Sequence, residues 1–127
     1  MKEGSVGIRR IVPNIYTDQI EASKAFFLKY LGMELAMDMG WVLTFVSTEN
    51  PTAQINLFKH EGGVPVNNEP VFMSVEVQDV DSMYQRAKEM NYPIVYDIRD
   101  ESWGVRRFFV KAPCGATLNL LAHLSQG

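Results

Sequence analysis

Hydrophobic and polar positions follow the same order in two successive blocks of the chain. The first block runs through RRIVPNIYTD, IEASKAFFLKYLG, MELAMDM, WVLTFVS and AQINLF. The second runs through VFMSVEVQDV, DSMYQRAKEM, PIVYDI, VRRFFV and ATLNLL. Alternation with period two is typical of strands, and a period near 3.6 is typical of an amphipathic helix. Each block therefore predicts one strand, one helix and then three strands.

The two predicted helices carry recognisable start and stop signals. In the first, Ile20, Phe27 and Leu31 share one side, and Gly32 closes the helix. In the second, Asp79 or Asp81 is expected to cap the N-terminus, and the helix ends before Tyr92 and Pro93. Its apolar side is expected to carry Tyr84, Ala87 and Met90.

The two blocks superpose with an offset of about sixty residues, which indicates an internal duplication. Val12 falls on Phe72, Ile15 on Val75, and Asn56 on Asn119. We expect one domain, 1–127, made of two modules at about 8–60 and 70–123, joined by the linker KHEGGVPVNNEP. The predicted class is α+β, with two βαβββ modules forming a paired, curved mixed sheet around a central cleft.

Strand parity sorts the side chains between the two faces of each sheet. One set is apolar and is expected to pack under the helices: Ile11, Pro13, Ile15, Ile55 and Leu57 in the first module, and Val71, Met73, Val75, Leu118 and Leu120 in the second. The other set is mixed and is expected to face inward: Val12, Asn14, Tyr16, Gln54, Asn56 and Phe58, with Phe72, Ser74, Glu76, Thr117, Asn119 and Leu121. A mixed face suits a ligand cavity, although a solvated sheet face alternates in the same way.

Composition narrows the class of protein and of partner. A chain of 127 residues with 46% hydrophobic and 21% charged residues suits one globular domain. No apolar stretch is long enough to cross a bilayer, and the start MKEGSVGIRRI lacks a secretory signal pattern. A single cysteine, Cys114, excludes an internal disulfide, so we expect a soluble cytoplasmic protein. The net charge of -3 makes nucleic acid an unexpected partner.

Nearly the whole chain, from about Ile8 to His123, resembles the vicinal oxygen chelate superfamily. The resemblance rests on the doubled module, on NIYTDQIEASKAFFLKYLGMEL and above all on SWGVRRFFVKAPCGATLNLL. That superfamily includes glyoxalases, ring-cleaving dioxygenases and bleomycin resistance proteins, and it implies a glyoxalase-like fold. The Trp-Gly pair before a strand is most similar to the bleomycin resistance group, but Ala112 and Ala116 replace the Asp and Asn of that group's turn.

The same resemblance implies four metal-ligand positions, which in this chain are Val12, Asn56, Phe72 and Asn119. Metal-dependent relatives carry His, Gln or Glu at such positions, whereas here two groups are hydrocarbon and two are neutral amides. Zinc and iron are held by thiolate, imidazole or carboxylate groups. We therefore expect no metal cofactor at these positions and a pocket that orients a small molecule through hydrogen bonds and stacking.

A displaced metal site is the alternative. His60 lies four residues after Asn56, and His123 lies four after Asn119, so both have the inward parity. Glu76 and Tyr16 are expected at the same level, and two His and a Glu could bind one divalent metal ion. Both histidines also fall where strands end, which is typical of solvated side chains. Glu76 is in addition a candidate for a general base, and hence for a catalytic residue.

The remaining candidates are aromatic, basic and thiol side chains. Trp41 and Trp103 could each present an indole at the cleft mouth, but Trp41 is expected in the core or at a dimer contact. Arg106 and Arg107 must point to opposite faces, and the inward one would favour an anionic ligand. We assign no role to Cys114.

Three functions of different classes follow from these residues. The first is a metal-free protein that binds or sequesters a small planar or cationic compound, with ligand contacts at Asn14, Asn56, Phe72, Trp103 and Asn119. The second is a metal-dependent lyase, isomerase or dioxygenase with a displaced site. The third is a partner domain whose cleft is filled by side chains. The resemblance also implies a homodimer, and whether any reaction is catalysed stays open.

Overall fold

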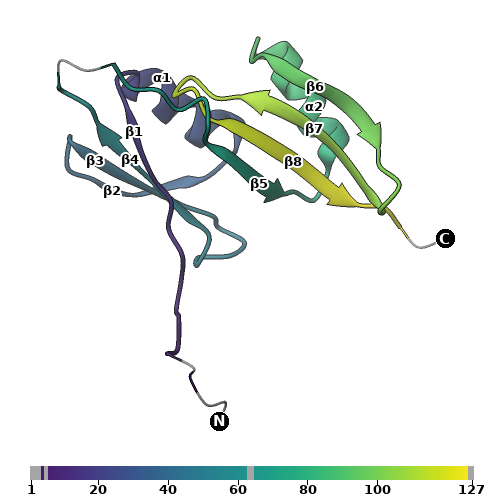
Figure 1. Ribbon diagram of the computed structural model, residues 1–127, viewed down its shortest axis with the longest axis horizontal. Helices are drawn as coiled ribbons and strands as arrows, with labels where there is room; N and C mark the ends of the chain where they lie inside the picture. The colour runs from purple at the N-terminus through teal and green to yellow at the C-terminus, as the bar shows by residue number, and fades with distance from the viewer. Residues whose placement is uncertain (1–3, 5, 63–64, 126–127) are drawn as a thin grey trace. The chain divides into compact units, whose positions relative to one another are not determined.

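The computed structural model describes residue 4 and residues 6–62 and 65–125, and the chain divides into two compact units, 1–66 and 67–127. The first unit has β1 (Asn14–Thr17), helix α1 (Ile20–Ala25) and the π-helical turn η1 (Phe26–Tyr30). Strands β2 (Glu34–Asp38), β3 (Val42–Val46) and β4 (Gln54–Lys59) follow. They form one four-stranded sheet in the order β1-β4-β3-β2 (Figure 1).

The second unit repeats this layout. It has β5 (Phe72–Glu76), helix α2 (Val80–Glu89), β6 (Ile94–Asp100), β7 (Val105–Lys111) and β8 (Thr117–His123). Their sheet has the order β5-β8-β7-β6, in which β5 and β8 are parallel and the other pairs antiparallel. The predicted α+β class and the βαβββ order of both modules are confirmed.

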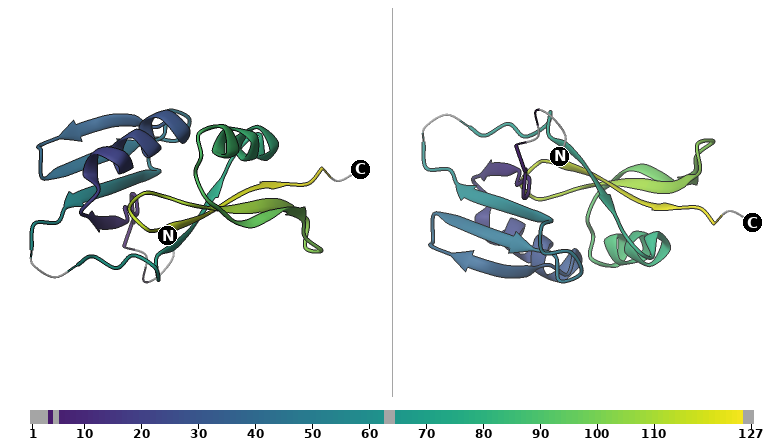
Figure 2. Two further views of the ribbon diagram at one scale, coloured as in Figure 1. Left: turned by 90° about the horizontal axis from the view of Figure 1, so that it is seen from above. Right: turned by 90° about the horizontal axis from the view of Figure 1, so that it is seen from below.

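One helix covers one face of each sheet, and the other face carries no helix. Helix α1 contacts β4, and α2 contacts β6, β7 and β8. Figure 2 shows α1 in front of its sheet from one side and behind it from the opposite side, and it shows α2 on a single side of its own sheet. We call the helix-free face of each sheet its open face.

Burial on the helix side of the first unit follows the predicted parity from β1 onward. Ile15, Ile55 and Leu57 are buried there. The expectation for Ile11 and Pro13 is wrong, because both are exposed and the regular strand begins only at Asn14. Among the described residues before Asn14, Ile11 forms an isolated β-bridge with Ala53, and the Pro13 carbonyl accepts from the Asn56 amide.

The first predicted helix is a short α-helix continued by a π-turn, in which the Leu31 amide donates to the Phe26 carbonyl five residues earlier. The wider turn accompanies the burial of three aromatic side chains, Phe26, Phe27 and Tyr30, rather than the single apolar side that was predicted. Gly32 follows with a left-handed φ of 69°, as expected for a helix end.

In the second unit, Leu118 and Leu120 are fully buried with Ala87 and Phe108 on the α2 side. Asp79, one of the two predicted caps, is the N-cap of α2 and accepts a hydrogen bond from the Ser82 amide at 3.1 Å. Within the described residues, no helix has both the length and the apolar character required to cross a membrane.

Removing the α2 cap tests how this helix is held. We expect Asp79→Ala to lower the free energy of unfolding by about 1 kcal/mol, because the Ser82 amide loses its acceptor. Asp79→Asn keeps a side-chain oxygen and is expected to lose less than half of that. Urea denaturation followed by circular dichroism measures both, and equal stability of the Ala variant and the wild type would contradict the assignment of the cap.

Candidate functional site

The open faces carry the polar and aromatic side chains that were predicted to face inward. In the first unit, Asn14 pairs with Asn56 and Tyr16 with Phe58 across β1 and β4. In the second, Phe72 pairs with Thr117, Ser74 with Asn119, and Glu76 with Leu121 across β5 and β8.

A row of hydrogen-bonded polar side chains crosses the open face of the first unit. The Thr44 hydroxyl donates to Asn56 Oδ1 at 2.6 Å, and Asn56 Nδ2 donates to Asn14 Oδ1 at 2.9 Å. Thr44, Asn56 and Asn14 lie opposite one another on three neighbouring strands. Both ends of the Asn56 amide are therefore engaged inside this unit.

Aromatic rings lie one pleat further along the same face. Tyr16 stacks on Phe58 with ring centroids 5.1 Å apart, and Trp41 lies 6.0 Å from Phe58. Trp41 is 54% exposed, so the expectation of a core position is wrong. It stays outside the core because it precedes β3, next to Gly40, and its indole rests on the edge of this aromatic group.

The corresponding amide of the second unit, Asn119, is more deeply buried. Its Nδ2 donates to Ser74 Oγ at 3.0 Å, as Asn56 donates to Asn14. Its Oδ1 is buried and has no hydrogen-bond partner among the described residues. A buried amide oxygen without a partner costs about 1 to 3 kcal/mol. The duplication has therefore kept the strand-to-strand amide contact in both units, but only one of the amides is fully satisfied.

The most developed feature of the second unit is a group of five side chains around Arg107, which we call the Arg107 cluster: Tyr96, Glu101, Trp103, Arg107 and Phe109. The guanidinium carbon of Arg107 lies 4.9 Å from the Trp103 and Phe109 ring centroids and 5.2 Å from that of Tyr96. Its Nε donates to Glu101 Oε2 at 2.7 Å, and the Tyr96 hydroxyl donates to the same oxygen at 2.6 Å. Tyr96 and Phe109 stack with centroids 4.5 Å apart.

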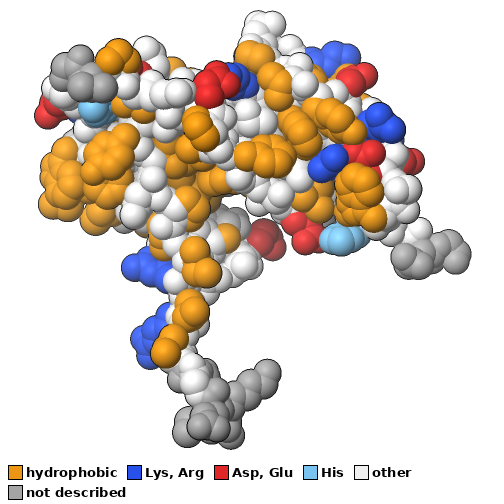
Figure 3. Space-filling view, viewed as in Figure 1, with side chains coloured by type: hydrophobic (Ala, Val, Ile, Leu, Met, Phe, Trp, Pro, Cys, Tyr) orange, Lys and Arg blue, Asp and Glu red, His pale blue; other side chains and the backbone are white. Residues whose placement is uncertain are grey.

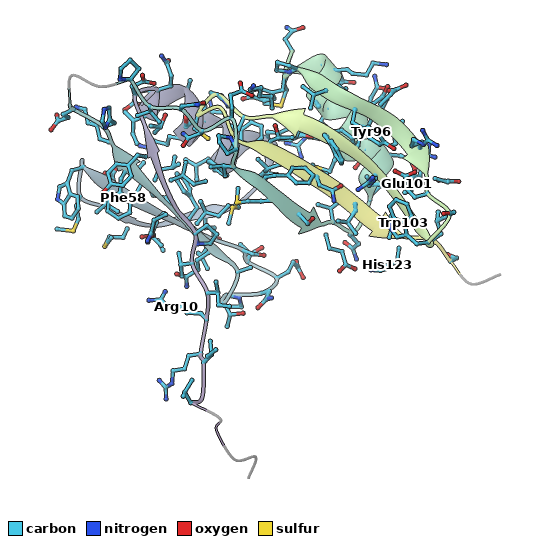
Figure 4. All side chains as sticks on the ribbon, in the orientation of Figure 1. Arg10, Phe58, Tyr96, Glu101, Trp103 and His123 are labelled. Atoms are coloured by element: carbon cyan, nitrogen blue, oxygen red, sulfur yellow. The ribbon has the colours of Figure 1, made fainter. Side chains whose placement is uncertain are left out.

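Two irregularities bring the Arg107 cluster together. The β6–β7 register shifts between Tyr96 and Arg99, so these residues, three apart, lie opposite Phe109 and Arg107 on adjacent open-face positions of β7. The hairpin then turns through Glu101 to Gly104, with Gly104 at a left-handed φ of 94°. This turn returns Trp103 over Arg107, and Figure 4 shows Tyr96, Glu101 and Trp103 along this edge of the unit.

The structure decides which arginine has which role. Arg107 lies on the open face, whereas Arg106 binds Asp81 of α2 and Asp100 of β6, each at 2.9 Å. Figure 3 shows charged groups of both signs among hydrophobic side chains on this unit. Sequence reasoning found Trp103 and both arginines, but it missed Tyr96, Glu101 and Phe109. An adjacent Arg-Arg and Phe-Phe run does indicate that one residue of each pair faces each side.

Glu101 is a buried carboxylate, with 6% of its side chain exposed. The Tyr96 hydroxyl and then the Arg107 guanidinium hold its pKa below its ordinary value of 4.5. Arg99 adds a weaker contact at 3.3 Å. Glu101 is therefore ionised at neutral pH, and its contact with Nε holds the Arg107 guanidinium in position.

The second unit brings together two of the three side chains of the histidine–glutamate alternative. In the second unit, His123 Nε2 lies 4.0 Å from Glu76 Oε2, and both side chains are about two-thirds exposed. His60 belongs to the first unit, directly after β4. Within either unit, no group of three or more His, Cys, Asp or Glu side chains of the described residues is arranged to hold a metal ion.

The expectation that Tyr16 and Glu76 lie level with the two histidines is wrong by two residues. Tyr16 is level with Phe58 and Glu76 with Leu121, so each histidine lies one pleat beyond. The family positions are offset in the same way. Asn56 pairs with Asn14, two residues after Val12, and Phe72 pairs with Thr117 rather than with Asn119. Phe72 itself is exposed and makes an edge contact with Phe109 at 5.0 Å.

The remaining candidates lie elsewhere. Cys114 is buried in the turn before β8, and burial raises the pKa of its thiol, which disfavours a nucleophilic thiolate. A shallow pocket of about 190 Å³ lies at the N-terminal end of α2, lined in part by Asp79, Arg106 and His123. Ligand pockets usually exceed about 300 Å³. Because Arg106 is already paired with two aspartates, we place the candidate site on the open faces instead.

Comparison with protein families now adds to this geometry. The family described as "Glyoxalase/Bleomycin resistance protein/Dioxygenase superfamily" matches residues 7–120. The chain belongs to this superfamily. A search of curated protein sequences finds no significant match.

Solved structures of the glyoxalase/bleomycin resistance superfamily share the fold. A glyoxalase/bleomycin resistance protein/dioxygenase from Nocardioides is 25% identical with a TM-score of 0.70, covering 98% of this chain and 89% of that one. Lactoylglutathione lyase from Agrobacterium tumefaciens is 16% identical with a TM-score of 0.70, covering 91% and 95%. TioX from Micromonospora sp. ML1 is 16% identical with a TM-score of 0.74, covering 91% and 98%.

The protonation of Glu101 gives a testable pH dependence. Because its pKa is lowered in the folded state, the ionised carboxylate stabilises the fold above its ordinary pKa. That contribution is lost as the pH falls through the lower folded pKa. We expect Glu101→Gln to be less stable than the wild type near neutral pH, with the difference shrinking in acid.

Urea denaturation across a pH series measures this difference. Glu49→Gln, at an exposed position of the β3–β4 loop, is the matched control and is expected to stay close to the wild type throughout. A Glu101→Gln difference that is constant with pH would contradict the assigned role of the carboxylate.

Proposed function

We propose that this member of the superfamily binds or sequesters a small planar organic molecule on the open faces of its sheets, without using a metal ion. The proposed contacts on the first unit are Asn14 and Asn56, and those on the second unit are Phe72, Asn119 and the Arg107 cluster, which includes Trp103. The observation that carries the proposal is the chemistry of the open faces, where amides, hydroxyls and exposed aromatic rings stand together.

Aromatic exposure is the first support. Trp103 is 63% exposed, and Phe72 is also largely exposed although both rings touch other aromatic or cationic groups. Exposed rings beside a few fixed polar groups are typical of sites for flat ligands, because stacking buries a large area at little entropic cost. In the second unit, Asn119 Oδ1 is the amide acceptor left for a directional hydrogen bond, because its Nδ2 already donates to Ser74.

The donor set argues against a metal centre at the family positions. Val12 and Phe72 have no donor atom. Asn56 uses its oxygen for Thr44 and its nitrogen for Asn14, and Asn119 offers a single neutral oxygen. Neutral amide oxygens without imidazole, thiolate or carboxylate do not match the ligand preferences of zinc or iron. No step of the proposed function therefore passes through a metal.

Metal analysis and native mass spectrometry of protein purified without a His tag test this reading. We expect no stoichiometric zinc, iron, manganese or nickel, and the native spectrum also tests the expected homodimer. Stoichiometric metal would instead favour the metal-dependent lyase, isomerase or dioxygenase. The variants Glu76→Gln and His123→Ala would then show whether the metal uses the contact between those two side chains.

Binding is tested with Trp41→Phe protein, in which Trp103 is the one indole, titrated with uncharged planar compounds such as 2-naphthamide. We expect the Trp103 indole N–H signal in nuclear magnetic resonance spectra to shift. Phe72→Ala and Asn119→Ala are each expected to weaken binding about tenfold, the size of a strong single-residue contact.

Gln85→Ala, on the exposed side of α2, is the matched control and is expected to bind like the parent protein. Equal affinities for Phe72→Ala, Asn119→Ala and the control would place the ligand elsewhere than on the open face of the second unit.

A further inference from the structure

The Arg107 cluster carries more information about the ligand than shape alone, because its charges and that of the neighbouring Arg99 do not cancel. Arg107 and Arg99 both contact Glu101, so two cations share one buried carboxylate. Glu101 is almost fully enclosed, whereas Arg107 keeps 20% and Arg99 keeps 64% of its side chain exposed. The accessible side of the cluster is therefore positive.

Other titratable groups near this face change the balance only weakly. Glu76 is level with Arg107, but β8 separates β5 from β7. Two strand spacings put the two backbones about 10 Å apart. That distance is about one Debye length at physiological salt, and Glu76 is exposed and lies against His123. Lys111, one pleat beyond Phe109, is paired with Glu69.

Arg107 also keeps hydrogen-bonding capacity. A guanidinium has five N–H donors in a planar fork. The contacts to Glu101 and to the Tyr96 oxygen use part of this set. Glu101 and three aromatic rings contact the guanidinium, so its orientation is fixed before a ligand binds. A fixed, partly exposed fork matches the two oxygens of a carboxylate.

We propose that the open face of the second unit selects a planar aromatic carboxylate, with Arg107 holding the carboxylate and Trp103 stacking on the ring. The inference rests on the proposed function and narrows it: of the planar and cationic compounds considered from the sequence, it disfavours the cationic ones. Arg107 and Arg99 would repel a cationic ligand. Glu101, the one carboxylate of the cluster, is buried and would not contact it.

Three matched probes test the proposal with the full-length, untagged protein: 2-naphthoate, 2-naphthamide and 2-naphthylmethylammonium. They share one ring and differ in charge. Titrations follow the Trp103 indole N–H and the Arg107 Nε–H signals by nuclear magnetic resonance. We expect 2-naphthoate to bind about tenfold more tightly than 2-naphthamide, the size of a charge-assisted hydrogen-bond contribution, and the ammonium compound to bind most weakly.

Variants separate the role of Arg107 in ligand binding from its role in packing. Arg107→Gln is expected to remove the preference for 2-naphthoate and to change 2-naphthamide binding less than about twofold. Because that change leaves the buried Glu101 with only the weaker contact to Arg99, the double variant Glu101→Gln/Arg107→Gln provides a form without either charge. Arg106→Gln, on the helix side, is the control and is expected to keep the preference.

Each outcome decides the matter. A preference for 2-naphthoate that depends on Arg107 supports the proposal. Equal or tighter binding of the amide or ammonium probe overturns it and leaves the proposed function standing. A preference that survives in the double variant also overturns it. If none of the three probes shifts the Trp103 signal, both this inference and the proposed function fail.

Discussion

The alternation of side chains along each strand is the constraint on which the rest of the structure depends. Each helix buries one face of its sheet, so every second residue must be apolar there, and its neighbours are released to the open face. Leu118 and Leu120 are fully buried under α2, while Asn119 between them reaches Ser74. A change that shifted the register by one residue would exchange these roles and would lose both the core and the site.

This constraint separates membership of the superfamily from its metal chemistry. The scaffold needs only the buried set, which both units contain, and the chain shares the fold of solved structures of the superfamily. The open-face set is free to change, and here it holds amides, hydroxyls and aromatic rings. Thr44, Asn56 and Asn14 satisfy one another in the first unit, and the corresponding position of the second unit is partnered by Ser74 alone. One fold therefore supports different chemistry through a few positions that contribute nothing to the core.

The sequence was sufficient for the order of the elements and for the two faces of β4 and β8, because these follow from local periodicity repeated twice. It placed Asn56 and Asn119 on the open faces correctly, and Asp79 among the caps. It could not give the level at which strands pair, so Tyr16 and Glu76 were expected two residues from their observed partners. Nor could it reveal the Arg107 cluster, because the register shift in β6 breaks the alternation from which Tyr96 and Glu101 would have been assigned. The core position considered for Trp41 was wrong because its size suggests burial, whereas its position before β3 leaves it exposed, and a dimer contact stays a prediction.

The central claim is that the open-face amides make hydrogen bonds and do not coordinate a metal ion. Paramagnetic broadening by Mn²⁺ tests it directly, because the effect is confined to signals close to the ion. We expect the side-chain amide signals of Asn56 and Asn119 to stay sharp in the presence of Mn²⁺. Selective broadening of these two signals, with the exposed amide of Gln85 unaffected, would contradict the account.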